Sequence, residues 1–195
     1  MYVNKSLLRL KYIKKRKKLY SEGIFFSFSK IFSLIKKNFP KRKPSIAGYY
    51  PSNFEVNILN FLHKANQKNF RIGLPVIEKD YKMVFKNWIP NDPLYVNKYG
   101  ILEPKKQNKM FKPDIILVPL VAFDKNLYRI GYGKGYYDRV LKRLSVNKKI
   151  LTIGIAFSFQ ECPLIPTNKY DYKLDCILTE RKLIYNQTNE NFISR

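Results

Sequence analysis

The chain has 195 residues, of which 45% are hydrophobic and 15% aromatic. This length suits one domain with a substantial core, and the composition excludes a generally disordered chain. No apolar run approaches the roughly 20 residues that cross a bilayer, which excludes a membrane-spanning helix. The formal net charge is +24, which taken alone would favour nucleic acid, an anionic membrane surface or an acidic substrate as a partner.

The basic residues are spread along the whole chain, beside abundant Asn, Ile, Tyr and Phe. We therefore interpret much of the charge as compositional bias rather than as a recognition surface. Cys162 and Cys176 lack the spacing of a metal site, so a reduced thiol pair is simpler than a disulfide or a metal site. We expect a cytoplasmic protein without a membrane partner, and a monomer.

Residues 1–18 predict a basic helix with four candidate core positions, which are Leu7, Leu8, Leu10 and Ile13. A targeting peptide is one interpretation, but an apolar region and a small-residue cleavage site are missing. A nucleic-acid-binding arm through the cationic run 14–18 is another. We favour the third interpretation, the first helix of the domain. A second helix is expected from Ser21 and Glu22 through Ile35.

A strand–helix–strand unit follows. Residues 46–50 predict a buried strand, residues 55–66 have helical spacing, and residues 70–74 predict the next strand. Such a unit implies a parallel sheet with a right-handed crossover. Ligands of these sheets bind outside the carboxyl ends of the strands, which places Tyr50 and Glu55 at that edge. From the residues alone, a favourable acid in the first turn of a helix is the simpler interpretation of Glu55.

The middle of the chain offers little catalytic chemistry of its own. Residues 83–89 predict a strand, and residues 105–112 a polar loop. The one histidine, His63, falls on a predicted helix among apolar neighbours, and no nucleophile elbow accompanies it. We expect His63 to be a packing residue.

Residues 112–144 are the most informative stretch. An apolar run at 115–122 leads through a polar turn to the glycine ladder R-I-G-Y-G-K-G-Y-Y-D at 129–138, and then to an amphipathic helix. A strand, a glycine loop and a helix N-terminus together form a common anion site, because backbone N–H groups and the helix dipole face the ligand. Arg129 and Lys134 add two cations and Asp138 a carboxylate, which suggests a nucleoside triphosphate with Mg²⁺.

Two familiar phosphate motifs are excluded. Gly135 follows Lys134 where a Walker A loop needs Ser or Thr, and the third glycine comes one residue too early for the dinucleotide fingerprint. From the ladder alone, a glycine-rich turn with solvated cations stays open as the alternative.

Two further strands are expected at residues 149–157 and 176–179. Asp171 and Asp175 lie between them, where plain turn chemistry accounts for them. The order of elements predicts an α/β fold: one three-layer α/β/α domain with a mainly parallel sheet and an N-terminal basic helix. Its core would span about residues 5–181, with residues 186–195 as a polar tail.

The string FDKNLYRIGYGKGYYDR, after PDIILVPLVA, closely resembles the signature of the 5-formyltetrahydrofolate cyclo-ligase (5,10-methenyltetrahydrofolate synthetase) family. The matching positions are Pro119, Phe123, Asp124, Arg129, the three glycines, Tyr136, Tyr137, Asp138 and Arg139. The start of the chain, Lys5-Ser-Leu-Leu-Arg9, and the segment 165–180 resemble the family's first and closing segments. Leu127 and Asn57 depart from the family, which often has Gly and Thr there.

The resemblance implies a ligase that forms a C–N bond, closing 5-formyltetrahydrofolate to 5,10-methenyltetrahydrofolate with Mg²⁺ and ATP and releasing ADP and phosphate. It implies catalytic roles for Arg129 and Lys134. The implied ATP-binding residues are Lys5, Arg9, Arg129, Gly131, Gly133, Lys134, Gly135, Tyr136 and Tyr137. The implied folate-binding residues are Tyr50, Glu55, Tyr99, Tyr132, Gly133, Lys134, Gly135 and Tyr136. Asp138 and Asp171 would hold Mg²⁺.

Two other functions stay open. A basic nucleic-acid-binding α/β protein would explain the charge, but it leaves the glycine ladder and Asp138 without a purpose. A family member that binds folate or nucleotide without turnover is compatible with the Leu127 and Asn57 departures. The charge would also attract a folate that carries several glutamates.

Overall fold

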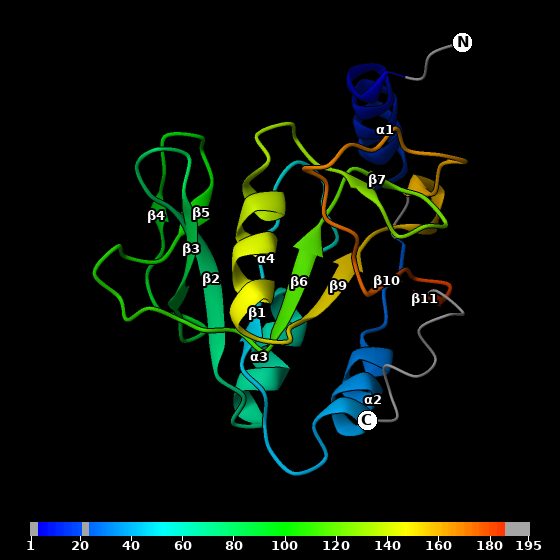
Figure 1. The fold of residues 1–195 in the computed structure, drawn as a ribbon. Coiled ribbons are helices and arrows are strands. Elements are labelled where there is room, and N and C mark those ends of the chain that lie inside the picture. Colours follow the sequence, from blue (N-terminus) through cyan, green and yellow to red (C-terminus); the bar gives the residue numbers. More distant parts are fainter. Residues whose placement is uncertain (1–3, 21–23, 186–195) are drawn as a thin grey trace.

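The computed structural model describes residues 4–20 and 24–185, and its centre is a seven-stranded sheet with the order β11–β10–β9–β6–β1–β2–β3 (Figure 1). The pairs from β10 to β2 are parallel, and the edge strands β11 and β3 run antiparallel. The expected mainly parallel sheet is confirmed. The strands are β1 (Ile46–Ala47), β2 (Ile72–Ile77), β3 (Met83–Asn87), β6 (Ile115–Pro119), β9 (Leu151–Ile155), β10 (Cys176–Leu178) and β11 (Leu183–Tyr185).

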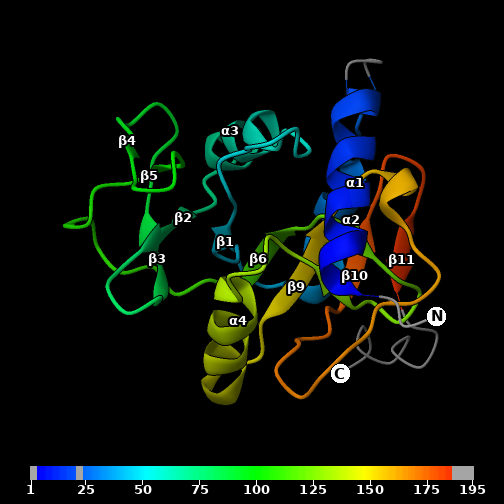
Figure 2. The same ribbon diagram turned by 90° about the horizontal axis from the view of Figure 1, so that it is seen from above.

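Helices cover both faces of this sheet. Seen from above, α3 (Leu59–Gln67) and α4 (Tyr136–Asn147) lie on opposite sides of the central strands (Figure 2). Successive side chains of a strand point to opposite faces. Accordingly, Ile115 and Leu117 of β6 join the core cluster of α3 and α2 (Ser29–Asn38), whereas Ile116 and Val118 join the cluster of α4. A strand buried on both faces needs a continuous apolar run, and the three-layer prediction is confirmed.

The basic helix α1 (Lys5–Tyr20) lies at the end toward which β6 and β9 point (Figure 1). Its Tyr12 packs in one cluster with residues of the small hairpin β7 (Ala122–Phe123) and β8 (Arg129–Ile130). The helix is therefore part of the domain, as we favoured. Two of its expected core positions are wrong: Leu7 and Leu10 are 66% and 58% exposed, and the helix buries Tyr12 and Arg16 instead.

Two helix starts differ from the expectation. The second helix begins at Ser29 after irregular residues 24–28, and Ser21 and Glu22 lie outside the described residues. The helix expected from Glu55 begins at Leu59, whose N–H is bonded by the Asn57 side chain at 2.9 Å. Residues 53 and 54 form a left-handed turn, with φ of 47° and 62°, and residues 55–58 after it are irregular. Glu55 is therefore not an acid in a first helical turn.

A second small hairpin, β4 (Tyr95–Val96) and β5 (Leu102–Glu103), was not predicted. Its turn is closed by the Asn97 side chain, which accepts from the N–H groups of Tyr99 and Ile101 at 2.8 and 3.1 Å. This brings Tyr99 to the tip of the hairpin. The edge strand β11 was also not predicted. Strands of two or three residues leave no periodic pattern to recognise.

Asp114, just before β6, ties the start of that strand to β1. Its carboxylate accepts from the N–H and Oγ of Ser45 at 2.7 and 2.8 Å, and it pairs with Arg42 at 2.8 Å and Lys148 at 2.5 Å. Burial alone would raise the pKa of Asp114, but hydrogen bonds from Arg42, Lys148 and Ser45 outweigh burial and lower the pKa. The carboxylate therefore stabilises the fold while it is ionised.

We expect Asp114→Asn to lower the free energy of unfolding by about 2 kcal/mol at neutral pH. The value is kept modest because the ion pairs with Arg42 and Lys148 are weakened by solvent around these exposed side chains. A carboxyl with a lowered pKa stabilises the fold above its unfolded pKa of about 4, so the deficit should shrink as the pH falls below that value. Urea unfolding at several pH values measures both effects. The exposed Asp92→Asn is the control, and a D114N variant as stable as wild type at neutral pH would contradict this account.

Candidate active site

A pocket of about 450 Å³ opens beside the carboxyl ends of β1 and β6, between α1, the glycine loop and the β4–β5 hairpin. Its walls bring together every residue that the sequence suggested for ATP, folate or Mg²⁺. These are Lys5, Arg9, Tyr50, Glu55, Tyr99, Arg129, Gly131, Tyr132, Gly133, Lys134, Gly135, Tyr136, Tyr137, Asp138 and Asp171. The segments span residues 5 to 171, so the fold alone assembles them.

The glycine loop, residues 131–135, joins β8 to the N-terminus of α4. Gly133 and Gly135 have φ of 94° and 65°, in the left-handed region that favours glycine. Arg139 of the first helical turn donates to the carbonyl of Lys134 at 2.9 Å and to that of Tyr81 at 3.0 Å, which fixes the end of the loop. A glycine loop running into a helix N-terminus matches the geometry of an anion site.

We expect Gly133→Ala to weaken ATP binding about tenfold, or roughly 1.4 kcal/mol. A Cβ at this position would be strained by its φ and would lie 3.3 Å from the guanidinium carbon of Arg9. Calorimetric titration with ATP measures the effect. Gly100→Ala is the control, since Gly100 has φ of 74° but no atom within 4 Å of the added Cβ. Equal affinities of G133A and wild type would contradict a close approach of ligand and loop.

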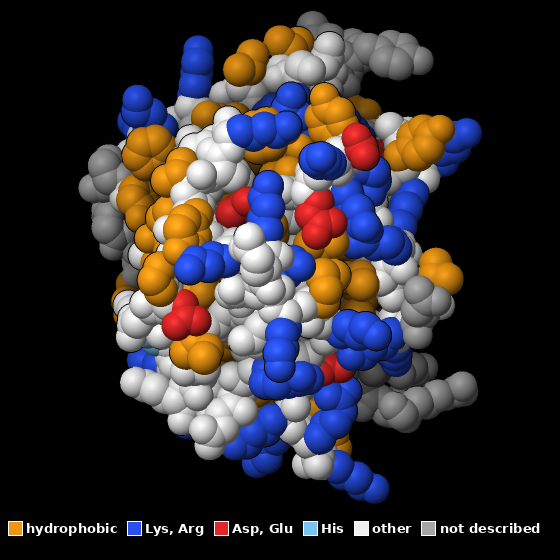
Figure 3. All heavy atoms as spheres, turned by 90° about the vertical axis from the view of Figure 1, so that its left-hand side faces the viewer, with side chains coloured by type: hydrophobic (Ala, Val, Ile, Leu, Met, Phe, Trp, Pro, Cys, Tyr) orange, Lys and Arg blue, Asp and Glu red, His pale blue; other side chains and the backbone are white. Residues whose placement is uncertain are grey.

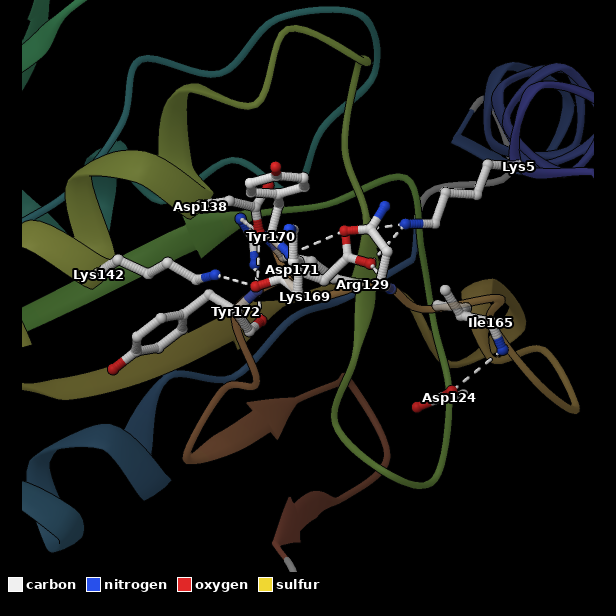
Figure 4. A network of polar contacts seen from close by, with 11 residues as sticks. Lys5, Asp124, Arg129, Asp138, Lys142, Ile165, Lys169, Tyr170, Asp171 and Tyr172 are labelled. Atoms are coloured by element: carbon white, nitrogen blue, oxygen red, sulfur yellow. Dashed lines mark hydrogen bonds and ion pairs between the residues drawn. The ribbon is translucent and has the colours of Figure 1, made fainter.

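Cations and carboxylates alternate along one wall of the pocket (Figure 4). Lys5 of α1 pairs with Asp171 at 2.7 Å, although the two residues are 166 positions apart. Arg129 is buried, pairs with Asp138 at 2.9 Å and donates to the carbonyl of Tyr172 at 3.1 Å. Lys134 is exposed on the glycine loop. A polyanion would therefore meet both exposed and buried positive charge.

The carboxylates of Asp138 and Asp171 are the hard oxygen ligands that Mg²⁺ prefers. Within residues 4–20 and 24–185, no group of three or more His, Cys, Asp or Glu side chains forms a site for a metal ion. Mg²⁺ commonly binds to one or two carboxylates and completes its shell with phosphate oxygens and water. The two aspartates fit that kind of site. Asp175 does not line the pocket; its carboxylate accepts hydrogen bonds from the N–H and the hydroxyl of Thr152, each at 2.7 Å.

At another part of the pocket wall, Glu55 is a buried carboxylate among aromatic rings. It accepts from the N–H and Oγ of Ser52 at 2.9 and 3.3 Å, and the side chain of Tyr132 lies beside it. Burial raises the pKa of Glu55, while hydrogen bonds from Ser52 and Tyr132 and the charge of Arg16 oppose the rise. A buried carboxylate next to aromatic faces is suited to a flat heterocycle that donates N–H groups.

Two residues near this pocket were missed from sequence. Arg16 was grouped with the cationic run 14–18, but its side chain is buried. Its spacing could have indicated this, because Lys5, Arg9, Tyr12 and Arg16 repeat every three or four residues and share one helix face. Glu103 is also buried and lines the pocket, accepting from the N–H of Ile77 at 3.1 Å. Glu103 was not singled out from the sequence.

On the face that carries the β4–β5 hairpin, Lys and Arg side chains are interleaved with apolar ones, with few Asp and Glu (Figure 3). In the part of the chain that the structure describes, no helix is both long and apolar enough to cross a membrane.

Comparison with known proteins shows the family and the fold of this chain. The model of the 5-formyltetrahydrofolate cyclo-ligase family matches residues 2–180. The 5-formyltetrahydrofolate cyclo-ligase of Haemophilus influenzae is 33% identical over 144 residues, or 71% of this chain and 76% of the relative. That of Mycoplasma genitalium is 40% identical over 135 residues, or 69% and 71% of the two chains.

Two solved structures are also similar. The NMR structure of Aquifex aeolicus 5,10-methenyltetrahydrofolate synthetase has a TM-score of 0.75 and 32% identity, covering 94% of this chain and 93% of that one. The Mycoplasma pneumoniae 5,10-methenyltetrahydrofolate synthetase has a TM-score of 0.65 and 26% identity, covering 91% and 99%. This chain therefore belongs to the 5-formyltetrahydrofolate cyclo-ligase family of enzymes.

Proposed function

We propose that the enzyme closes 5-formyltetrahydrofolate to 5,10-methenyltetrahydrofolate at the cost of one ATP, with Mg²⁺ bound, and releases ADP and phosphate. Family membership supports the substrate and the reaction. The observation that carries the proposal is that one pocket contains a glycine loop at a helix N-terminus, flanked by cations, and a buried carboxylate among aromatic rings. The first suits a triphosphate, and the second suits a pterin.

The chemistry explains why ATP is needed. The oxygen of a formyl amide is a poor leaving group. In the proposed reaction that oxygen attacks the γ-phosphorus, and the bond to ADP breaks. N10 of the folate then attacks the activated carbon and loses its proton to the departing phosphate or to water, and the carbon–oxygen bond breaks to release phosphate. The protein forms no covalent bond, so its contribution is to position the two substrates and to neutralise charge.

On the nucleotide side we assign Arg129, Lys134, Lys5 and Arg9 to the triphosphate, together with the amides of the glycine loop and of Tyr136 and Tyr137. Arg9 is anchored for this by its Nε, which donates to the carbonyl of Gly131 at 2.7 Å. Asp138 and Asp171 would hold Mg²⁺, which when bound neutralises charge on the phosphates. Arg129 is catalytic in this scheme through the charge it keeps beside Asp138.

On the folate side we assign Glu55 to the N–H groups of the pterin. Tyr50, Tyr132 and two further tyrosines would supply aromatic contact. Tyr99 at the hairpin tip and Tyr136 at the start of α4 are joined by a hydroxyl–hydroxyl hydrogen bond of 2.9 Å, with ring centroids 6.3 Å apart. This pair lies at the exposed side of the pocket, where a bound folate would be covered.

The setting of the reaction is part of the proposal. Cys162 and Cys176 are both buried and free, which fits a reducing compartment, and we expect the enzyme to act as a monomer in the cytoplasm. The exposed cations of the surface would attract folates that carry several glutamates.

An absorbance assay for methenyl-folate tests the proposal. Purified enzyme should form the product from 5-formyltetrahydrofolate only when ATP and Mg²⁺ are both present, and chelation of Mg²⁺ should stop it. Tight binding of folate or ATP without product would instead identify a family member without turnover. Absence of both binding and product would contradict the proposal altogether.

A further inference from the structure

The side chain of Arg16 is the most deeply buried charge near the pocket, with 1% of the residue exposed. Its guanidinium donates to the carbonyl of Leu120 at 3.1 Å and to the hydroxyl of Tyr132, and it lies 5.7 Å from the centre of the Tyr132 ring. Tyr132 belongs to the glycine loop and lies beside Glu55 in the wall of the pocket. A chain of contacts therefore runs from α1 through the loop to the buried carboxylate.

We propose that Arg16 is a positioning residue for the folate end of the pocket, which holds Tyr132 in place and supplies the positive charge that the buried Glu55 faces. The inference rests on the proposed function for the identity of what Glu55 binds. Arg16 reaches Glu55 through Tyr132, and we assign it no contact with substrate.

The surroundings of Glu55 show why such a charge is needed. Four ionisable side chains face it, each from a different segment: Arg16 of α1, Tyr49 after β1, Tyr132 of the glycine loop and Tyr137 of α4. Of these four, only Arg16 is positively charged. Burial and the charge of Glu55 raise the pKa of Tyr132 to about 12, so Tyr132 stays neutral. Removing Arg16 would therefore take away the one cation among these four neighbours of the carboxylate.

A purely structural role explains Arg16 less well. Burying a guanidinium costs free energy, and a buried ion pair is poor evidence for stability. The Nε–H of Arg16 is buried and has no hydrogen-bond partner among the described residues, which adds to that cost. A planar guanidinium can bond a carbonyl and a hydroxyl at once through its fixed fork and lie near an aromatic ring, a combination for which a lysine ammonium is less suited. The residue type therefore matches the three contacts observed.

Direct titration of Glu55 tests the proposal without relying on activity. The carboxyl carbon of Glu55 can be followed by NMR in ligand-free protein and assigned with Glu55→Gln. In folded Arg16→Met we expect the titration midpoint to rise by about one pH unit or more. In the control Lys14→Met, which removes an exposed charge from the same helix, the midpoint should stay at the wild-type value. An unchanged midpoint in folded R16M would overturn the proposal.

Steady-state kinetics then separates positioning from general damage. R16M should raise the KM for 5-formyltetrahydrofolate about tenfold with little change in the KM for ATP. Arg16→Lys keeps the charge but loses the guanidinium contacts that hold Tyr132. The titration midpoint of Glu55 should therefore stay at the wild-type value, while the KM for 5-formyltetrahydrofolate should still rise severalfold. If R16M does not fold, R16K decides: kinetics equal to wild type would overturn the proposal. If the wild-type enzyme has no cyclo-ligase activity, the proposed function is refuted. The Glu55 titration would still test whether Arg16 supplies the charge that Glu55 faces.

Discussion

Replacing Lys134 by alanine should lower kcat roughly 100- to 1,000-fold, the range expected when one charge that stabilises a transition state is removed. Lys134 lies on the glycine loop beside the helix N-terminus, where negative charge would build up between the γ-phosphorus and ADP. Its side chain is exposed, so the fold should not depend on it. Turnover at saturating substrates measures the effect, and urea unfolding should give wild-type stability.

The control for this change is Lys125→Ala. Lys125 is also an exposed lysine. It lies in the turn between β7 and β8, the hairpin that precedes the glycine loop, and it does not line the pocket. K125A should turn over at the wild-type rate, which would show that the loss in K134A does not come from reduced net charge. Turnover of K134A close to wild type would remove Lys134 from the mechanism.

The second large effect is expected from Glu55→Gln, which should lower kcat/KM for 5-formyltetrahydrofolate about 100-fold, or roughly 3 kcal/mol. Glutamine keeps the shape of the side chain, but its NH₂ group would face an N–H of the pterin. The KM for ATP should change little. Glu78→Gln is the control, because Glu78 is paired with Lys82 at 3.7 Å in a turn outside the pocket.

The pH dependence gives this prediction a second readout. Since burial raises the pKa of Glu55, wild-type kcat/KM should fall on the acid side with an apparent pKa above the ordinary value of about 4.3. E55Q should lack that fall. A carboxyl with a raised pKa favours folding less as the pH rises, so E55Q should be at least as stable as wild type at neutral pH. A stability loss matching the loss of affinity would mean that Glu55 serves the fold instead.

Features that depend on neighbours in sequence were predictable. The fully apolar run of β6 indicated a strand buried on both faces, and the glycine ladder indicated a loop before a helix. Both are local patterns with a direct physical cause. The family resemblance then implied site residues far apart in the chain. All the residues that it implied for ATP, folate or Mg²⁺ line one pocket.

Features that depend on tertiary contact were not predictable. Asp114 gains its partners from positions 42, 45 and 148, which no periodicity connects. Glu55 was expected in the first turn of a helix, but it follows a left-handed turn and the helix begins only at Leu59. Arg16 has the same residue type as its exposed neighbours; its spacing placed it on one helix face with Lys5 and Tyr12, but only the packing of α1 shows that this face buries it.

The fate of the formyl oxygen is the sharpest test of the proposal that the pocket brings the γ-phosphate of ATP to a folate's one-carbon group. A substrate that carries a heavy oxygen isotope in the formyl group should pass it to inorganic phosphate, one labelled phosphate for each methenyl-folate formed. Mass spectrometry of the phosphate measures the transfer. Label found in water, with unlabelled phosphate released alongside product, would contradict the account.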